Sequence, residues 1–156
     1  MADPVSPDSS PGELLTQAVR ALRRTWVGDL GEWGLSPHQA RALRVVAGAD
    51  GTRPSDLARA LRIAPRSATE VVDDLAGKGL VRRAPAPSDR RAVLVQLTDR
   101  GRAVAEQVRR AREDNSARFF ARLSERDRTE LSRILRRLMA DQPDARAETR
   151  GPAQRA

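Results

Sequence analysis

Residues 54–101 read PSDLARALRIAPRSATEVVDDLAGKGLVRRAPAPSDRRAVLVQLTDRG. Apolar residues recur at helical spacing in residues 54–61 and again in residues 65–78, and Ile63-Ala64-Pro65 breaks the pattern between them. Two short helices joined by a tight turn are typical of a helix-turn-helix. This stretch therefore predicts a unit that reads double-stranded DNA.

A basic hairpin is expected directly after the second helix. Gly77 and Gly79 suit the end of that helix, because glycine accepts the left-handed conformation found there. Residues 80–83 form a short strand, a proline-rich turn reverses the chain, and residues 93–97 alternate as a partly buried strand does. The hairpin carries four arginines: Arg82, Arg83, Arg90 and Arg91.

Length and charge fit this interpretation. A chain of 156 residues suits a single domain, and its net charge of +8 and pI near 11.4 are typical of nucleic-acid binders. Lys78 is the only lysine, so a bias toward arginine contributes to the charge. The placement of arginines at a turn, where no core requires them, favours DNA contact over a merely solvated loop.

Several classes of site are excluded or disfavoured. The chain has no cysteine, which excludes disulfides and thiolate metal sites, and its one histidine argues against a metal site; we expect no cofactor. No catalytic motif stands in a recognisable context, so we expect no enzyme; Asp73-Asp74 is interpreted as a solvated face with arginine partners. Residues 1–11 and 141–156 are polar, so we expect disordered tails, no membrane span and a cytoplasmic protein.

Amphipathic helices flank the central module. Residues 12–27 carry a seam of Leu15, Val19, Leu22 and Trp26, and a helix with a capping box opens at Ser36. After the hairpin, Thr98 caps a long helix that ends near Leu123, and Ser124 caps a last helix.

The resulting fold class is mainly α, a single domain of residues 12–140 with a winged helix-turn-helix at about 36–100. Helices at about 12–27 and 98–140 are expected to pair two copies in a homodimer, because a module of about fifty residues cannot bury all their apolar stripes. The alternative is that they fold back on their own subunit.

The sequence resembles the MarR family of transcriptional regulators from about Glu13 to Met139. The residues that carry the resemblance, in order, are Leu35-Ser36-Pro37-His38-Gln39-Ala40, Asp56-Leu57-Ala58, Val71-Val72-Asp73-Asp74-Leu75, Lys78-Gly79-Leu80-Val81, Asp89-Arg90-Arg91 and Val95-Gln96-Leu97-Thr98-Asp99-Arg100-Gly101. Leu123-Ser124 with Asp127 is similar to the start of the family's final helix.

The resemblance implies a recognition helix in the major groove. Its leading portion, which meets bases and phosphates, is Pro65, Arg66, Ser67, Ala68, Thr69 and Glu70. Arg66 is the expected base reader, since a guanidinium can bond both acceptors of a guanine edge. Ser67 and Thr69 are expected at phosphates, with a solvated helix face as the alternative.

The resemblance also implies a wing arginine in the neighbouring minor groove. Arg90 aligns with that arginine and Asp89 with the acid that holds it. Arg91 is expected to add a phosphate contact, with a solvated strand residue as the alternative, and Arg82 is a further candidate for DNA contact. One departure concerns the cap of the recognition helix, where Ala64-Pro65 replaces the serine or threonine of many relatives.

An effector site is implied as well, because many family members release DNA when a small aromatic or anionic molecule binds. Trp26, Trp33 and His38 are the candidates to line it. For each we favour a simpler interpretation: Trp26 in the dimer core, Trp33 as a loop anchor and His38 as an exposed residue of a first helical turn.

Three functions remain open. We favour a homodimeric, sequence-specific transcriptional repressor that binds a pseudo-palindromic operator in double-stranded DNA and is relieved by a small ligand. The alternatives are a sequence-indifferent architectural DNA-binding protein, which the net charge motivates, and a winged helix that binds protein partners.

Overall fold

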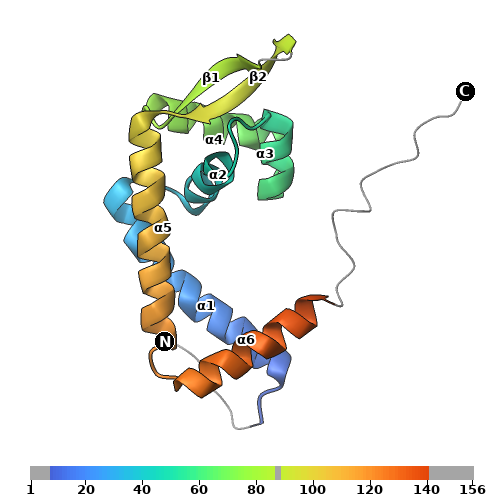
Figure 1. Ribbon diagram of the computed structural model, residues 1–156, viewed down its shortest axis with the longest axis vertical. Coiled ribbons are helices and arrows are strands. Elements are labelled where there is room, and N and C mark those ends of the chain that lie inside the picture. Colours follow the sequence, from blue (N-terminus) through green and yellow to red (C-terminus); the bar gives the residue numbers. More distant parts are fainter. Residues whose placement is uncertain (1–7, 87–88, 141–156) are drawn as a thin grey trace, which may run out of the picture. The chain divides into compact units, whose positions relative to one another are not determined.

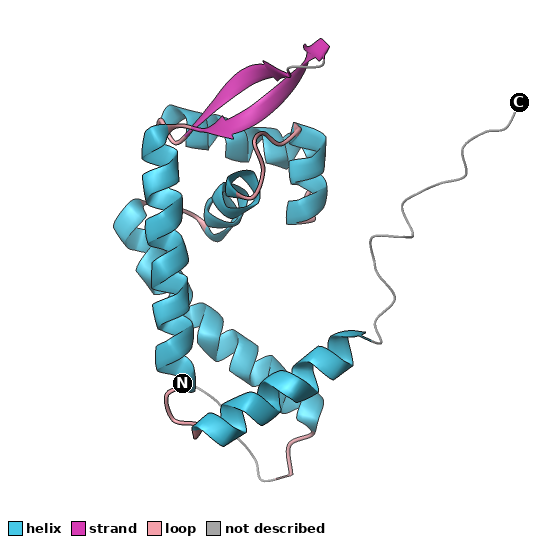
Figure 2. Ribbon diagram, viewed as in Figure 1, coloured by secondary structure: helices cyan, strands magenta, loops and turns pink. Residues whose placement is uncertain are grey.

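The computed structural model describes residues 8–86 and 89–140, with the backbone alone at residues 89–91. The elements are α1 (Pro11–Leu30), the 3-10 helix η1 (Gly31–Trp33), α2 (Pro37–Ala47), α3 (Pro54–Leu61), α4 (Pro65–Gly77), β1 (Val81–Ala86), β2 (Asp89–Leu97), α5 (Asp99–Phe120) and α6 (Glu125–Ala140) (Figures 1 and 2). The chain divides into two compact units between Ser116 and Ala117, inside α5. The mainly α, winged-helix fold class is confirmed, and the expected tails fall largely outside the described residues.

Capping boxes start the first two α-helices. At Ser36 the hydroxyl accepts from the Gln39 N–H at 3.2 Å and the Ser36 N–H donates to Gln39 Oε1 at 3.0 Å, as the sequence predicts. Ser10 and Glu13 form a second box that begins α1 at Pro11, and α1 continues to Leu30, beyond the predicted range of about 12–27. The hydrogen bonds from Ser10 lower the pKa of Glu13.

Both helices of the helix-turn-helix are confirmed. α3 occupies the predicted residues 54–61, and α4 ends at Gly77, one residue before the expected end. Gly79 then adopts a φ of 68°, a left-handed conformation that an L side chain rarely takes, and the chain turns into the wing.

The wing is an antiparallel hairpin that is longer than predicted. β1 and β2 pair with Val81 opposite Leu97 and Arg83 opposite Val95, and the register shifts between Pro85 and Ala86 (Figure 2). The sequence did not reveal that Thr52 lies beside Val95, with two backbone hydrogen bonds of 3.0 and 2.9 Å. This bridge ties the segment between α2 and α3 to the wing.

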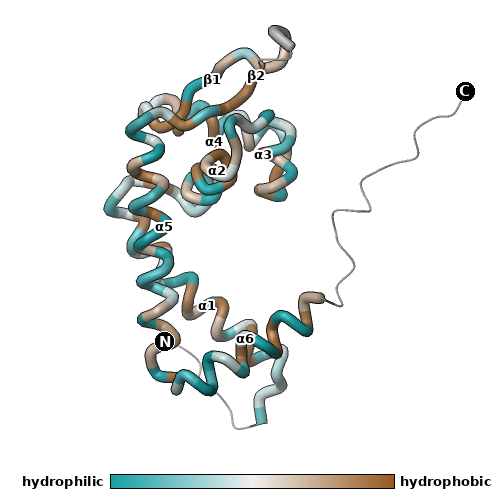
Figure 3. Tube along the Cα trace, in the orientation of Figure 1, coloured by the Kyte–Doolittle hydropathy of each residue, from teal (hydrophilic) through white to brown (hydrophobic). Residues whose placement is uncertain are grey.

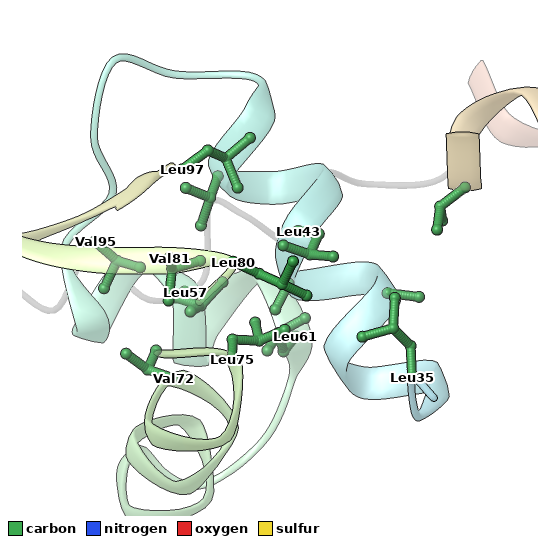
Figure 4. Close-up of a cluster of buried hydrophobic side chains, with 14 of the residues drawn as sticks. Leu35, Leu43, Leu57, Leu61, Val72, Leu75, Leu80, Val81, Val95 and Leu97 are labelled. Atoms are coloured by element: carbon green, nitrogen blue, oxygen red, sulfur yellow. The ribbon is translucent and has the colours of Figure 1, made fainter. Parts of the chain in front are cut away.

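One apolar core lies beneath α4 and the base of the hairpin. Most of the buried side chains come from α2, α3, α4 and both strands, and Leu30 of α1 and Val108 of α5 join them (Figure 4). Those shielded almost completely from solvent include Leu43, Leu57, Leu61, Val72, Leu75 and Val95. Along the tube of Figure 3, apolar and polar segments alternate through these helices, as a one-sided core requires.

The start of α5 is fixed against the start of the wing. Thr98 Oγ1 donates to Gly79 O at 2.7 Å and accepts from the Gly101 N–H at 2.9 Å, which confirms Thr98 as the cap. Gly101 is buried, and a Cβ placed there would lie 1.8 Å from Leu80 O. Only glycine permits this approach of two backbones.

The end of α5 differs from the prediction. The helix stops at Phe120 rather than near Leu123, and a short turn follows in which the Leu123 N–H donates to Phe120 O at 3.0 Å. Ser124 caps α6 as predicted, because its hydroxyl accepts from the Asp127 N–H at 3.2 Å. No helix in the described ranges has the length and apolar character that crossing a membrane requires.

Gly101→Ala should lower the free energy of unfolding by about 3 kcal/mol, because the added methyl group forces α5 away from Leu80. Urea denaturation measures the change. Gly28→Ala is the matched control: this position in α1 has open space around it, so the same methyl group should leave stability unchanged or raise it by about 0.5–1 kcal/mol. Equal effects of the two substitutions would contradict the close approach at Gly101.

Candidate nucleic-acid interface

α4 has one buried face and one exposed face. Ala68, Val72 and Leu75 are buried at spacings of four and three residues and seat the helix on the core. The exposed side of its first turns carries Pro65, Arg66, Thr69 and Glu70, whereas Ser67 is half-buried. The residues predicted for the leading part of a recognition helix, other than Ala68 and Ser67, are thus presented to solvent together.

The side chain of Arg66 is almost fully open to solvent. Its side chain is 92% exposed, and Nε lies 3.4 Å from Glu70 Oε1, one helical turn away. An exposed i,i+4 ion pair contributes only about 0.3–0.5 kcal/mol. The guanidinium can therefore exchange Glu70 for a guanine edge or a phosphate at little cost.

The hydroxyl of Thr69 has a partner within its own helix. Thr69 Oγ1 donates to Pro65 O at 3.1 Å, so the one hydrogen of this hydroxyl is engaged there. A contact of Thr69 with a phosphate requires that bond to open. Ala64 is the N-cap of α4 and provides no side-chain hydrogen bond. This agrees with the sequence, where Ala64-Pro65 replaces the capping serine or threonine of many relatives.

Asp73 and Asp74 hold α4 to two neighbouring elements. Asp73 Oδ1 lies 2.7 Å from Arg83 Nη1 on β1, and Asp74 Oδ2 accepts from Gln39 Nε2 of α2 at 3.0 Å. An arginine partner is confirmed for Asp73, whereas the partner of Asp74 is an amide. The pair braces the recognition helix against the wing and against α2.

The two arginines of β1 have different surroundings. Both are exposed, but Arg83 makes the ion pair with Asp73, whereas Arg82 lies opposite Gln96 in the hairpin register. Successive strand residues point to opposite faces, which explains the difference. Arg82 therefore stays a candidate for DNA contact, and Arg83 acts within the protein.

At the wing tip, Asp89, Arg90 and Arg91 form the start of β2, with Asp89 opposite Ala86. Their side chains lie outside the described residues. The assignment of Arg90 to the minor groove therefore stays a prediction.

The winged helix carries a net positive charge. Residues 37–98 hold eleven Arg and Lys residues and six Asp and Glu residues, whereas residues 1–36 hold three and five. The net charge is therefore +5 in residues 37–98, −2 in residues 1–36 and +5 in residues 99–156. A polyanion is the partner that such a surface attracts.

Two further residues fix the helix-turn-helix, and the sequence did not single them out for this role. Arg41 on α2 donates through Nη2 to Ala60 O at 2.8 Å, at the end of α3, and Lys78 Nζ donates to Gly34 O at 2.7 Å. Both partners are backbone carbonyls far away in the sequence. No local pattern could have indicated these contacts.

The three candidates for an effector site lie on three successive elements, α1, η1 and α2. Trp26 and Trp33 are half-buried against the core, and Trp33 Nε1 donates to Gln107 Oε1 at 3.2 Å, which agrees with the loop-anchor interpretation. His38 is exposed in the first turn of α2. Two hollows, neither lined by any of these three residues, lie along the first turns of α1 and α6. The described residues contain no cluster of His, Asp and Glu suited to a metal ion.

A helix-turn-helix with an exposed recognition face, followed by a two-stranded wing, defines a winged helix-turn-helix protein. A family model described as the MarR family matches residues 33–92. The repressor Rv2887 of Mycobacterium tuberculosis is 30% identical over 134 residues, which cover 86% of this chain and 96% of the relative. The chain belongs to the MarR family of helix-turn-helix transcriptional regulators.

Other similarities agree with this assignment. An uncharacterized helix-turn-helix regulator of Mycobacterium bovis, Mb0904, is 40% identical over 95 residues, which span 60% of this chain but only 66% of the relative. The crystal structure of apo MarR from E. coli matches with a TM-score of 0.73 at 26% identity. The matched region covers 84% of this chain and 98% of the MarR chain. Rv2887 in complex with p-aminosalicylic acid has a TM-score of 0.68 at 28% identity and covers 84% and 99%.

The Asp73–Arg83 pair should couple the wing to α4 by about 0.5 kcal/mol, because both side chains are about half exposed. A double-mutant cycle with Asp73→Asn and Arg83→Gln, measured by urea denaturation, gives this coupling energy. It should decrease in 1 M salt, where screening is stronger. Strictly additive effects of the two substitutions would show that the pair does not hold the wing.

Proposed function

We propose that the protein is a homodimeric, sequence-specific DNA-binding transcriptional repressor that acts in the cytoplasm. α4 enters the major groove of a pseudo-palindromic operator, and the arginines of the wing enter the adjacent minor groove. The observation that carries the proposal is the exposed leading face of α4, where Arg66 is 92% exposed on a helix whose other face is fixed by the core. Relatives such as Rv2887 are named as repressors, which supports repression rather than activation.

Unpartnered apolar side chains support the homodimer. On α1, Leu14, Leu15, Val19 and Val27 are exposed by 39 to 49%. On α6, the exposed apolar residues are Ile134, Leu138 and Met139. Pairing of two copies would shield these side chains and place two recognition helices about 34 Å apart, one turn of DNA.

A sequence-indifferent architectural DNA-binding protein is the second candidate, because the net charge of +8 alone supports attraction to any duplex. The two functions differ in selectivity. A regulator should prefer its operator over random DNA by more than about a thousandfold, whereas an architectural protein should not.

Selection of binding sites from random duplex DNA at near-physiological salt separates these functions. The proposed repressor should enrich an inverted repeat whose half-site centres lie roughly ten base pairs apart. Binding without enrichment would favour the architectural protein. Absence of any salt-dependent binding would point to a winged helix used for protein partners.

Arg66→Ala and Arg90→Ala should affect the selected operator differently. Loss of Arg66 should weaken operator binding by about 1–3 kcal/mol per half-site and relax the preference at one base pair, because a bidentate base contact is removed. Loss of Arg90 should weaken binding most where the flanking minor groove is A·T-rich. Fluorescence anisotropy with operator and substituted duplexes measures both effects.

Arg44→Gln is the matched control, since Arg44 is exposed on α2 and the same charge is lost there. It should leave both sequence preferences unchanged. Wild-type selectivity in both the Arg66 and the Arg90 variants would refute the assigned roles, whatever their overall affinities.

We propose further that a small aromatic acid relieves repression, which the p-aminosalicylate complex of Rv2887 supports. The chain has only two tryptophans, Trp26 and Trp33, so its fluorescence reports on the region where sequence reasoning expects the ligand. Salicylate should quench this emission and release the operator over the same concentration range. Trp26→Phe and Trp33→Phe variants assign the signal, and release of the operator without any quenching would exclude a site beside either tryptophan.

A further inference from the structure

Arg62 follows the last residue of α3 in a left-handed conformation. Its φ is 57° and its ψ is 47°, and it is the one residue other than glycine with a positive φ in the described parts of the chain. The Ile63 N–H donates to Ala58 O and the Arg62 N–H to Arg59 O, both at 3.2 Å. This hydrogen-bond pattern ends many helices, and glycine usually occupies the left-handed position because any Cβ is crowded there.

No contact within the described chain compensates for this crowding. The side chain of Arg62 is exposed and makes neither a hydrogen bond nor an ion pair with a described residue. Neighbouring arginines differ, since Arg59 pairs with Asp56 at 3.0 Å and Arg66 with Glu70 at 3.4 Å. A residue that strains its backbone without an internal partner suggests a role outside the folded chain.

The position of Arg62 suits a phosphate beside the recognition helix. Arg62 lies four residues before Arg66, so their Cα atoms are at most about 15 Å apart. The major groove is about 12 Å wide, and rows of phosphates form its rims. With the start of α4 in the groove, the side chain of Arg62 is within reach of a rim.

The local charge also favours an anion. Residues 53–70 contain the arginines 53, 59, 62 and 66 and two acids, Asp56 and Glu70. Both acids are engaged by Arg59 and Arg66. Arg62 is exposed, and each acid within residues 53–70 already has another arginine as its partner.

We propose that Arg62 is a phosphate-binding residue of the DNA interface, presented by the turn of the helix-turn-helix to a phosphodiester at the rim of the groove that α4 enters. This inference rests on the proposed function. A guanidinium matches two phosphate oxygens in a bidentate contact. Because phosphates are alike in every sequence, Arg62 contributes equally to operator and random DNA.

Arg62→Gly tests the proposal, because folding and DNA binding should respond in opposite directions. Glycine relieves the backbone strain, so the thermal midpoint should rise by about 2–4 °C. The dissociation constants for operator and random duplexes should both increase about tenfold or more. The slope of log affinity against log salt should become shallower by about one for each Arg62 lost, or about two per dimer.

Two controls accompany this variant. Arg62→Lys keeps the charge and the backbone cost, so its salt slope and thermal midpoint should match those of the wild type. Arg44→Gln removes an equal charge from α2 and should leave the salt slope unchanged.

The outcomes separate this inference from the proposed function. If the wild type binds its operator and Arg62→Gly binds both duplexes with unchanged affinity and salt slope, Arg62 has no phosphate contact and the inference alone is lost. A loss confined to the operator would make Arg62 a base reader and overturn the inference as stated. A lower thermal midpoint of Arg62→Gly would show that the left-handed arginine stabilises the fold, which would overturn the argument from backbone strain. Absence of salt-dependent DNA binding by the wild type would end both proposals.

Discussion

Burial of one side of α4 is the constraint on which the rest of this structure depends. Val72 and Leu75 enter the core with Leu57 and Leu61 of α3, so the rotation of α4 about its own axis is fixed. That rotation determines which side chains face outward at the start of the helix. A change in the core that rotated α4 would displace the side chain of Arg66. Its contacts would then be disturbed as much as by a substitution of Arg66 itself.

Polar contacts refine what the core establishes. The Asp73–Arg83 pair, the Asp74–Gln39 hydrogen bond and the bond from Lys78 to Gly34 O join α4 and its end to the wing, to α2 and to the segment after η1. Each is at least partly exposed and contributes little to stability. Their common effect is orientation, since they limit how far the wing and the recognition helix can move independently.

Local signals in the sequence were sufficient to predict most of the architecture. The capping box at Ser36, the span of α3 and the caps at Thr98 and Ser124 were correct because each depends on residues within a few positions. The box at Ser10 carried the same signal but stood in a segment expected to be a tail.

Contacts between distant segments carried no such signal. The bridge from Thr52 to Val95 and the bond from Trp33 to Gln107 join residues more than forty positions apart, and the sequence gives no register for them. Within the site, it predicted which residues open α4. It predicted an arginine partner for Asp73 but not that this partner would be Arg83, because that depends on the face of the hairpin on which each strand residue lies.

Lys78 has a chemical consequence, because it is the only lysine in the chain. Amine-directed reagents can therefore modify a single side chain, and its nitrogen already donates to Gly34 O at the end of the recognition helix. Acylation would remove the charge and disturb that bond, so a label attached there would report on the junction it perturbs. Reversible acetylation would modify the same amine. Because no other lysine competes for the acetyl group, this modification would act selectively at the junction between Lys78 and Gly34.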